Sequence, residues 1–222
     1  MNRTSRWVAV VLAGGFVALA PHASACGNSM RGHRATQEMR LVFDEQEEVF
    51  TPRLQLAEAA LREGKLLLAS SELDAIAARI REASPRLRAR FERVASLLSV
   101  RSDGQWPVQT PGAQNKPAAR ARALELAANK LRQRLTAGPD DPIRLSDLGE
   151  ALAALPKHRK EAKNILEKLA ARDLLTSPHG YAALSRLRLL AKDEDGANQA
   201  LNACRKLDEK GVACPSATSP KA

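Results

Sequence analysis

Apolar residues recur every three or four positions along most of the chain, which is the spacing of one face of an α-helix. The segment 86–99 is the clearest example, with Leu87, Phe91, Val94 and Leu98 on one face. Comparable stripes begin at Leu54, Ala69, Leu124, Leu145, Ala162, Tyr181 and Ala197. Alanine, leucine, arginine and glutamate dominate the composition and β-branched residues are scarce, which favours helices over strands. The sequence therefore predicts an all-α protein.

A residue able to cap a helix stands directly before a proline at Thr51, Ser84, Asp141 and Ser177. The side-chain oxygen of such a residue accepts a hydrogen bond from a free amide in the first turn, and proline at the first helical position has no amide to satisfy. Each of these sites is therefore predicted to start a helix. The four prolines are separated by 33, 57 and 36 residues, which indicates a repeat in the mid-thirties whose second copy carries an insertion.

Each interval contains two amphipathic helices with a break between them. The breaks fall at Gly64, at Pro156 and at the acidic turn 192–196, which is expected to cap the helix that follows it. In the second interval the break is the segment 101–117, which is rich in proline and glycine and is predicted to be a loop. A pair of short helices cannot bury its apolar face alone, so neighbouring pairs are expected to stack on one another. A plain helical bundle is the alternative, because amphipathic helices alone do not specify how they pack.

These helix pairs resemble the tetratricopeptide repeat. The family motif places a bulky residue before a Leu-Gly step in the first helix and a small residue after the turn. The third pair matches the first half of the motif through Leu145, Leu148, Gly149 and Leu152. The fourth pair matches through Tyr181, Leu184, Ala197, Leu201 and Cys204, and departs from the motif at Ser185 and Arg188. The resemblance covers residues 51–208, is closest over 141–208 and is weakest over 85–138.

The resemblance implies a right-handed α-solenoid of about four helix pairs, in which the first helices form a concave surface that binds a partner. Carried over through the matched positions, this surface comprises Glu58, Arg62, Ser146, Glu150, His179 and Arg186. The lysine and asparagine residues with which some relatives clamp a peptide carboxylate are not evident on these first helices. Trp106, in the long loop, either anchors a partner or packs onto the helix at 86–99, and packing is favoured because a large apolar ring prefers to be covered.

Residues 1–25 have the layout of a secretory signal peptide. Two arginines precede the apolar run 7–20, and Ala23 and Ala25 supply the small residues that signal peptidase inspects. No later apolar run reaches the roughly 18 residues of a membrane span. We therefore expect export to the periplasm or beyond the cell. Residues 26–50 are then a linker, whose last part, MRLVFDEQEEVF, is expected to form a helix that caps the first repeat.

The cysteines allow two further predictions. Cys26 follows the cleavage site directly, where bacterial lipoproteins carry their acylated cysteine, so an outer-membrane-anchored lipoprotein is the alternative to an unmodified exported protein. Cys204 and Cys214 are predicted to form a disulfide, and the alternative is a buried Cys204 thiol with an unrelated second thiol. The bond would fold the irregular tail 209–222 over the last helix.

The charge of the chain is strongly basic, with a formal net charge of +10. The aromatic residues are too few for the stacking platforms of a nucleic-acid-binding protein, so no nucleic-acid partner is expected. The arginines of the segment 79–93 are interleaved with Glu82 and Glu92, and part of their charge is expected to be neutralised within and between helices. The remaining charge solubilises the surface or attracts acidic partners.

No residue pattern in the sequence is typical of an active site, a cofactor site or a metal site. The histidines lack a partner at metal-binding spacing, and neither a phosphate-binding loop nor a nucleophile elbow occurs. We therefore expect that the protein is not an enzyme and holds no cofactor. The favoured hypothesis is an exported scaffold or adaptor that binds a protein or peptide in the bacterial cell envelope. The alternative is a basic protein that binds anionic envelope polymers or surfaces through charge.

Overall fold

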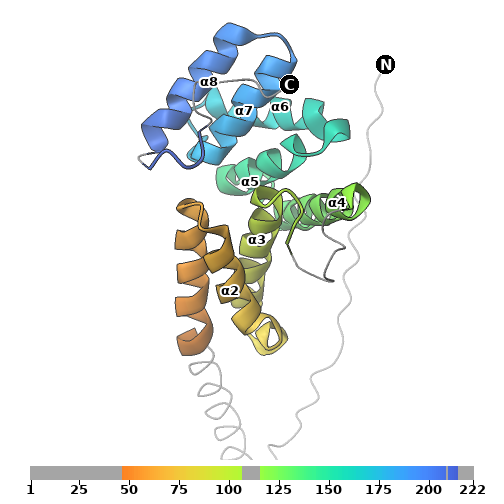
Figure 1. Ribbon diagram of the computed structural model, residues 1–222, viewed down its shortest axis with the longest axis vertical. Helices are drawn as coiled ribbons and strands as arrows, with labels where there is room; N and C mark the ends of the chain where they lie inside the picture. The colour runs from red at the N-terminus through yellow and green to blue at the C-terminus, as the bar shows by residue number, and fades with distance from the viewer. Residues whose placement is uncertain (1–46, 107–115, 209, 215–222) are drawn as a thin grey trace, which may run out of the picture. The chain divides into compact units, whose positions relative to one another are not determined.

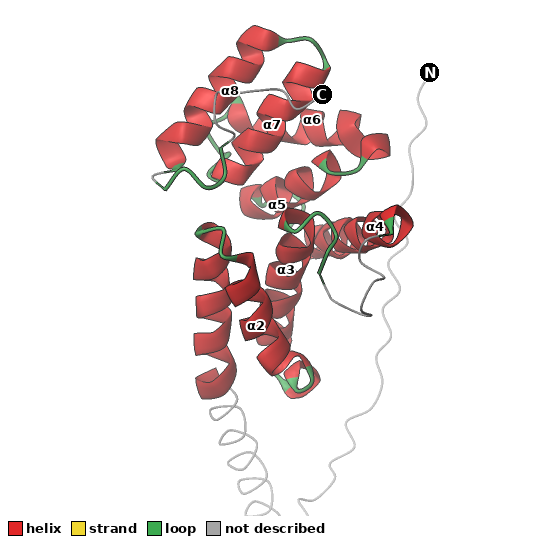
Figure 2. Ribbon diagram, viewed as in Figure 1, coloured by secondary structure: helices red, strands yellow, loops and turns green. Residues whose placement is uncertain are grey.

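The computed structural model describes residues 47–106, 116–208 and 210–214, all within one compact unit of residues 40–222. This part of the chain is helical and contains no strand, so the predicted all-α class is confirmed (Figure 1 and Figure 2). Its helices are residues 47–62, α2 (Leu66–Ala77), α3 (Pro85–Arg101), α4 (Pro117–Arg134), α5 (Pro142–Ala153), α6 (Arg159–Ala170), α7 (Pro178–Leu190) and α8 (Glu194–Leu207). Short 3₁₀ turns lie at Ile80–Glu82, Leu135–Ala137 and Pro156–His158.

Three of the four predicted capping residues begin helices. Ser84, Asp141 and Ser177 each accept a hydrogen bond from an amide in the first turn of α3, α5 and α7, and a proline follows each of them. The acidic turn also behaves as predicted, because the Asp193 side chain accepts from the Gly196 amide at the start of α8. α3 ends at Arg101 and α4 begins at Pro117, so both ends of the loop predicted at 101–117 agree with the structure. Residues 107–115 of this loop lie outside the described residues.

The prediction that a helix starts at Thr51 is wrong. The first described helix is already present at residue 47 and runs through Thr51 and Pro52, and the Thr51 hydroxyl lies 3.1 Å from a carboxylate oxygen of Glu47, one turn earlier. The apolar pattern explains the difference. Phe50 is only 1% exposed, so burial of its ring favours a helix that extends upstream of the proline.

The helices pack as sequential pairs, as the repeat pattern predicts (Figure 1). The segment 47–62 is joined to α2 by an ion pair of 2.8 Å between Arg53 and Glu72, while α3 packs on α4, α5 on α6 and α7 on α8. Each pair also contacts the next through α2 and α3, α4 and α5, and α6 and α7. The first helices of successive pairs meet as well, because α5 contacts both α3 and α7. These contacts join the buried apolar residues into one continuous core.

Two positions show how closely the helices of a pair approach each other. A Cβ on Gly149 of α5 would lie 2.7 Å from a methyl carbon of Leu166 on α6, so only glycine fits there without movement. At the corresponding place in the fourth pair, the Ser185 hydroxyl of α7 donates a hydrogen bond of 2.9 Å to the Ala197 carbonyl of α8. The serine that departs from the repeat motif therefore satisfies its own polar group at the helix contact.

Candidate functional site

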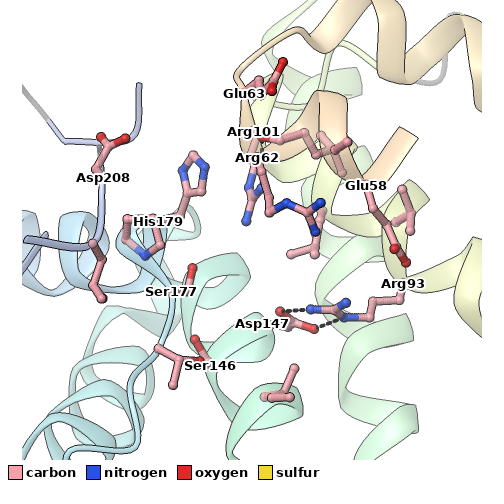
Figure 3. A pocket seen from close by; sticks show the side chains of 18 of the residues that line it. Glu58, Arg62, Glu63, Arg93, Arg101, Ser146, Asp147, Ser177, His179 and Asp208 are labelled. Atoms are coloured by element: carbon pink, nitrogen blue, oxygen red, sulfur yellow. Dashed lines mark hydrogen bonds and ion pairs between the residues drawn. The ribbon is translucent and has the colours of Figure 1, made fainter. Parts of the chain in front are cut away.

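The first helices of the four pairs line a hollow of about 560 Å³, which we call the first hollow (Figure 3). Glu58 and Arg62 lie on one side of it, and His179 at the start of α7 faces them from the other side (Figure 3). α3 and α5 contribute charged side chains between these two walls, and the chain beyond α8 contributes Asp208 and Lys210. The hollow is therefore a product of the stacking, since no single pair could form it.

A second hollow, of about 630 Å³, adjoins the first. It is lined by Glu150 of α5, by Arg186 of α7 and by residues 212–214 of the C-terminal tail. Arg101 and His179 border both hollows. The two hollows thus form adjoining parts of one surface that is lined by both charged and apolar side chains.

Arginines of α3 form ion pairs with carboxylates of the neighbouring first helices. Arg90 donates two hydrogen bonds of 2.8 Å to the carboxylate of Glu58 in the segment 47–62. Burial acts to raise the pKa of Glu58, but Arg90 and the other nearby arginines lower it below its ordinary value. Arg93 donates to Asp147 of α5 at 2.5 and 3.1 Å. Burial raises the pKa of Asp147 in spite of Arg93, and the Asp147 carboxylate in turn raises the pKa of Arg93.

The most deeply buried of these pairs joins Arg101 of α3 to Glu150 of α5. Arg101 donates two hydrogen bonds, of 2.8 and 3.1 Å, to the carboxylate, and the two side chains are 12% and 6% exposed. Arg101 also donates to the Leu61 carbonyl at 3.3 Å. Burial raises the pKa of Glu150, but the charge and hydrogen bonds of Arg101, with a smaller contribution from Arg186, bring it below its ordinary value. Glu150 is therefore an ionised carboxylate that already has its partner.

Two side chains of the first hollow have a buried polar atom without a hydrogen-bond partner among the described residues. These atoms are Oγ of Ser146, whose residue is 3% exposed, and Nε2 of His179. Burial lowers the pKa of His179, and among the charged groups facing it Arg101 and Arg186 lower that pKa while Glu150 and Asp208 raise it. The imidazole is therefore neutral at neutral pH. Both atoms are enclosed by the protein, so neither is presented to a ligand in the hollow without movement of its surroundings.

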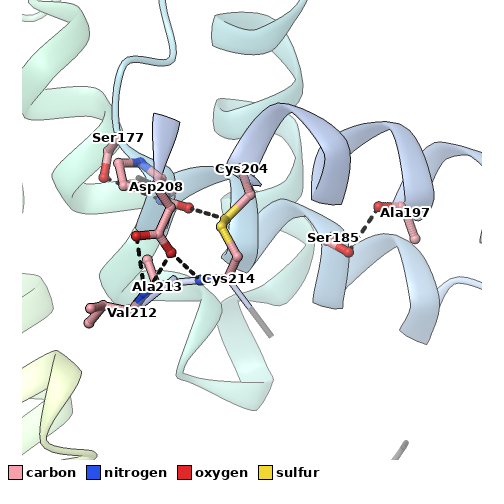
Figure 4. Close-up of a disulfide and its surroundings, with 10 residues drawn as sticks. Ser177, Ser185, Ala197, Cys204, Asp208, Val212, Ala213 and Cys214 are labelled. Atoms are coloured by element: carbon pink, nitrogen blue, oxygen red, sulfur yellow. Dashed lines mark hydrogen bonds between the residues drawn. A yellow bond between two sulfur atoms is a disulfide. The ribbon is translucent and has the colours of Figure 1, made fainter. Parts of the chain in front are cut away.

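The C-terminal tail is fixed by a disulfide and by one carboxylate (Figure 4). Cys204 and Cys214 are joined across a Cα–Cα distance of 5.8 Å. The Asp208 carboxylate accepts hydrogen bonds from the amides of residues 212, 213 and 214, at 3.0, 2.7 and 2.9 Å (Figure 4). Burial raises the pKa of Asp208, but these amides hold it below its ordinary value. The tail is therefore held in a defined turn directly after α8.

The disulfide returns the tail to the last helix at Cys204, and the described part of the tail also reaches the first helix pair; residues 215–222 lie outside the described residues. Lys210 lies 2.5 Å from a carboxylate oxygen of Glu63, and the ammonium groups of Lys210 and Lys65 lower the pKa of Glu63 to about 2. Val212 occupies the space that a side chain at Gly64 would fill. The missing side chain at Gly64 and the charge of Glu63 explain why the tail docks at this turn.

The structure brings the six predicted surface residues to the two hollows. Glu58, Arg62, Ser146 and His179 line the first hollow, while Glu150, His179 and Arg186 line the second. Trp106 packs against the apolar core and is partly buried, which matches the packing alternative. Cys26 lies outside the described residues.

The expected neutralisation of the 79–93 arginines between helices is present, since Arg90 and Arg93 pair with carboxylates on other helices. The sequence did not predict which carboxylates these are. A usable pattern was present, because Arg93 is eight residues before Arg101 and therefore lies on the same helix face. The acidic residues that pair with these two arginines, Asp147 and Glu150, lie three residues apart on α5.

In residues 47–106, 116–208 and 210–214, no cluster of three or more His, Cys, Asp or Glu side chains is placed to hold a metal ion. None of the helices in these ranges combines the length and apolar character needed to cross a membrane. Comparison with protein-family models, with characterised proteins and with solved structures finds no match. These observations define the class of the protein: an all-helical domain of sequentially packed helix pairs, with a hollowed surface of charged and apolar side chains on the first helices.

Proposed function

We propose that this protein is an exported scaffold or adaptor of the tetratricopeptide-repeat type, which binds another protein of the bacterial cell envelope. One observation carries the proposal: all four pairs contribute their first helix to the same hollow. Concave surfaces built by successive repeats are the usual binding surfaces of helical repeat proteins. Ion pairs such as Arg93 with Asp147 and Arg101 with Glu150 hold adjacent first helices together, so the surface is preorganised for a partner.

The repeat type is supported by the helix contacts within the third and fourth pairs. Gly149 follows Leu148 at the point where α5 touches α6, and Ser185 follows Leu184 at the equivalent contact between α7 and α8. This agrees with the small residue that the family motif requires at the position after leucine. In this proposal the pairs form a right-handed α-solenoid.

Export is supported by two independent features. The first is the signal-like layout of residues 1–25, and the second is the disulfide between Cys204 and Cys214, since such bonds persist in oxidising compartments. We assign the protein to the periplasm or the extracellular space, with lipid attachment at Cys26 as the alternative. The intact mass of the mature N-terminus distinguishes the two, because an acylated cysteine adds the mass of its lipid.

The test is quantitative co-purification from chemically crosslinked native envelopes. Arg62→Glu reverses a charge in the first hollow, and Lys168→Glu makes the same change on an exposed residue of α6 outside both hollows. We expect one or a few envelope proteins to co-purify with the wild type and with Lys168→Glu, and to decrease with Arg62→Glu. Equal recovery with both variants would contradict a binding role for the first helices.

A further inference from the structure

The carboxylates that line the two hollows are all engaged in the described structure. In the first hollow, Glu58, Asp147 and Glu63 are paired with Arg90, Arg93 and Lys210, and Asp208 accepts three backbone amides. In the second hollow, Glu150 is paired with Arg101 and Asp103 with Arg120. The negative charges of this surface are therefore already neutralised within the protein.

The arginines of the same surface are not all engaged. Arg62 lines the first hollow, Arg159 and Arg186 line the second, and all three are exposed. Among the described residues, no carboxylate oxygen lies within 4.0 Å of their guanidinium groups. The two hollows thus present positive charge that is free to pair with an incoming ligand.

Exposed aliphatic side chains lie beside these arginines. Ile143 and Leu207 line the first hollow and are 55% and 45% exposed. Leu190 and Val212 line the second and are 61% and 41% exposed. Large aliphatic side chains that remain exposed beside a polar hollow gain from being covered by a partner. The surface therefore combines free cations with apolar contacts.

We propose that the two hollows bind an acidic peptide segment of a partner protein, one that carries aliphatic side chains among its carboxylates. The carboxylates pair with Arg62, Arg159 and Arg186, since guanidinium groups bind carboxylates in bidentate geometry. The aliphatic side chains cover the four exposed residues named above. This inference rests on the proposed function, and it names the chemistry of the segment bound.

The apolar contacts favour a peptide over an anionic polymer. A polymer bound through charge alone would leave Ile143 and Leu190 exposed, and its affinity would collapse as salt screens the arginines. A peptide with aliphatic residues keeps part of its affinity in salt, because burial of apolar surface does not depend on screening.

The test is selection of a displayed library of random twelve-residue peptides on the purified, oxidised chain. We expect the enriched peptides to contain both acidic and aliphatic residues. Their affinity, measured by fluorescence anisotropy, should fall about tenfold for Arg62→Glu and for Arg186→Glu, which corresponds to about 1.4 kcal/mol each. Lys168→Glu should leave it unchanged. Replacement of glutamate by glutamine in the peptide should weaken binding in the same way, a result independent of any change in the protein.

Three results would overturn the inference. They are the absence of enrichment, enrichment of peptides without acidic residues, and an affinity that both arginine variants leave intact. Equal binding of poly-glutamate, abolished by moderate salt, would assign the surface to anionic polymers. The proposed function fails separately, in the envelope experiment: if Arg62→Glu decreases recovery of a partner there while the selected peptides are not acidic, the scaffold role stands and the peptide class is wrong.

Discussion

Replacement of Arg101 by methionine probes the most deeply buried link between two helix pairs. Methionine retains much of the apolar stem of the arginine, so the change removes the guanidinium with little loss of packing. Glu150, 6% exposed, would then keep a buried carboxylate without its partner. The hydrogen bond from Arg101 to the Leu61 carbonyl would be lost as well.

The expected size of the effect follows from burial. Removal of one partner of a buried ion pair costs about 3–5 kcal/mol, because the other charge stays uncompensated. Both side chains are well below one third exposed, so solvent screens their attraction only weakly. We expect the lower end, about 3 kcal/mol, since Arg101 borders both hollows and water can reach it there. For a domain of this size, this corresponds to a decrease in Tm of roughly 6–12 °C.

The assay is urea unfolding followed by circular dichroism and by the fluorescence of Trp106, which packs on the core. The double variant Arg101→Met/Glu150→Leu removes both charges and should lie within about 1 kcal/mol of the wild type. A loss of less than about 0.5 kcal/mol for Arg101→Met would refute the pair as a link between helix pairs. A double variant less stable than the single one would show that packing, and not the unpaired charge, dominates.

Three further changes test other parts of the structure. Gly149→Ala should destabilise the protein by about 1–3 kcal/mol in urea unfolding, because its Cβ would meet Leu166. No loss of stability would show that the Leu166 side chain repacks to make room for the new methyl group. Reduction of the disulfide, or the double change Cys204→Ser/Cys214→Ser, should lower the free energy of unfolding by about 2–3 kcal/mol, because it frees the short loop that the bond closes. The measurement is again urea unfolding. Unchanged stability would mean that the tail is held without the bond. The pKa of His179 is lowered from 6.5, so the unfolded chain takes up a proton that the folded protein does not, and stability decreases as pH falls below 6.5. His179→Gln should flatten this decrease, and an unaltered profile would remove His179 as its cause.

The helix pairs could be predicted from sequence because their determinants are local. Ser84, Asp141 and Ser177 each satisfy an amide in the first turn next to them, and the apolar stripes need only the periodicity of the helix. The prediction of a helix start at Thr51 failed because burial of Phe50 outweighed the local capping preference of Thr51. Burial of Phe50 depends on its packing in the folded protein, which a capping rule does not include.

The site was predictable only in part. Arg62, Ser146 and His179, which the repeat resemblance selected, line the first hollow, because residues on one face of each first helix come together when the pairs stack. The resemblance did not show which charges were already paired. The partner of Arg93 lies 54 residues away, and the tail contact between Lys210 and Glu63 spans 147 residues. Such contacts depend on how the pairs stack, and no local pattern encodes that.

The central claim is that partners bind on the first helices of the pairs. A photoreactive amino acid placed at single exposed positions in the native envelope tests it most directly. The probe is introduced at Arg62 and Arg186, which line the hollows, and at Lys168 and Leu126, exposed residues of α6 and α4 that line neither. We predict adducts with an envelope protein from the first two positions and none from the other two. Adducts from Lys168 or Leu126, with none from the hollows, would contradict the account.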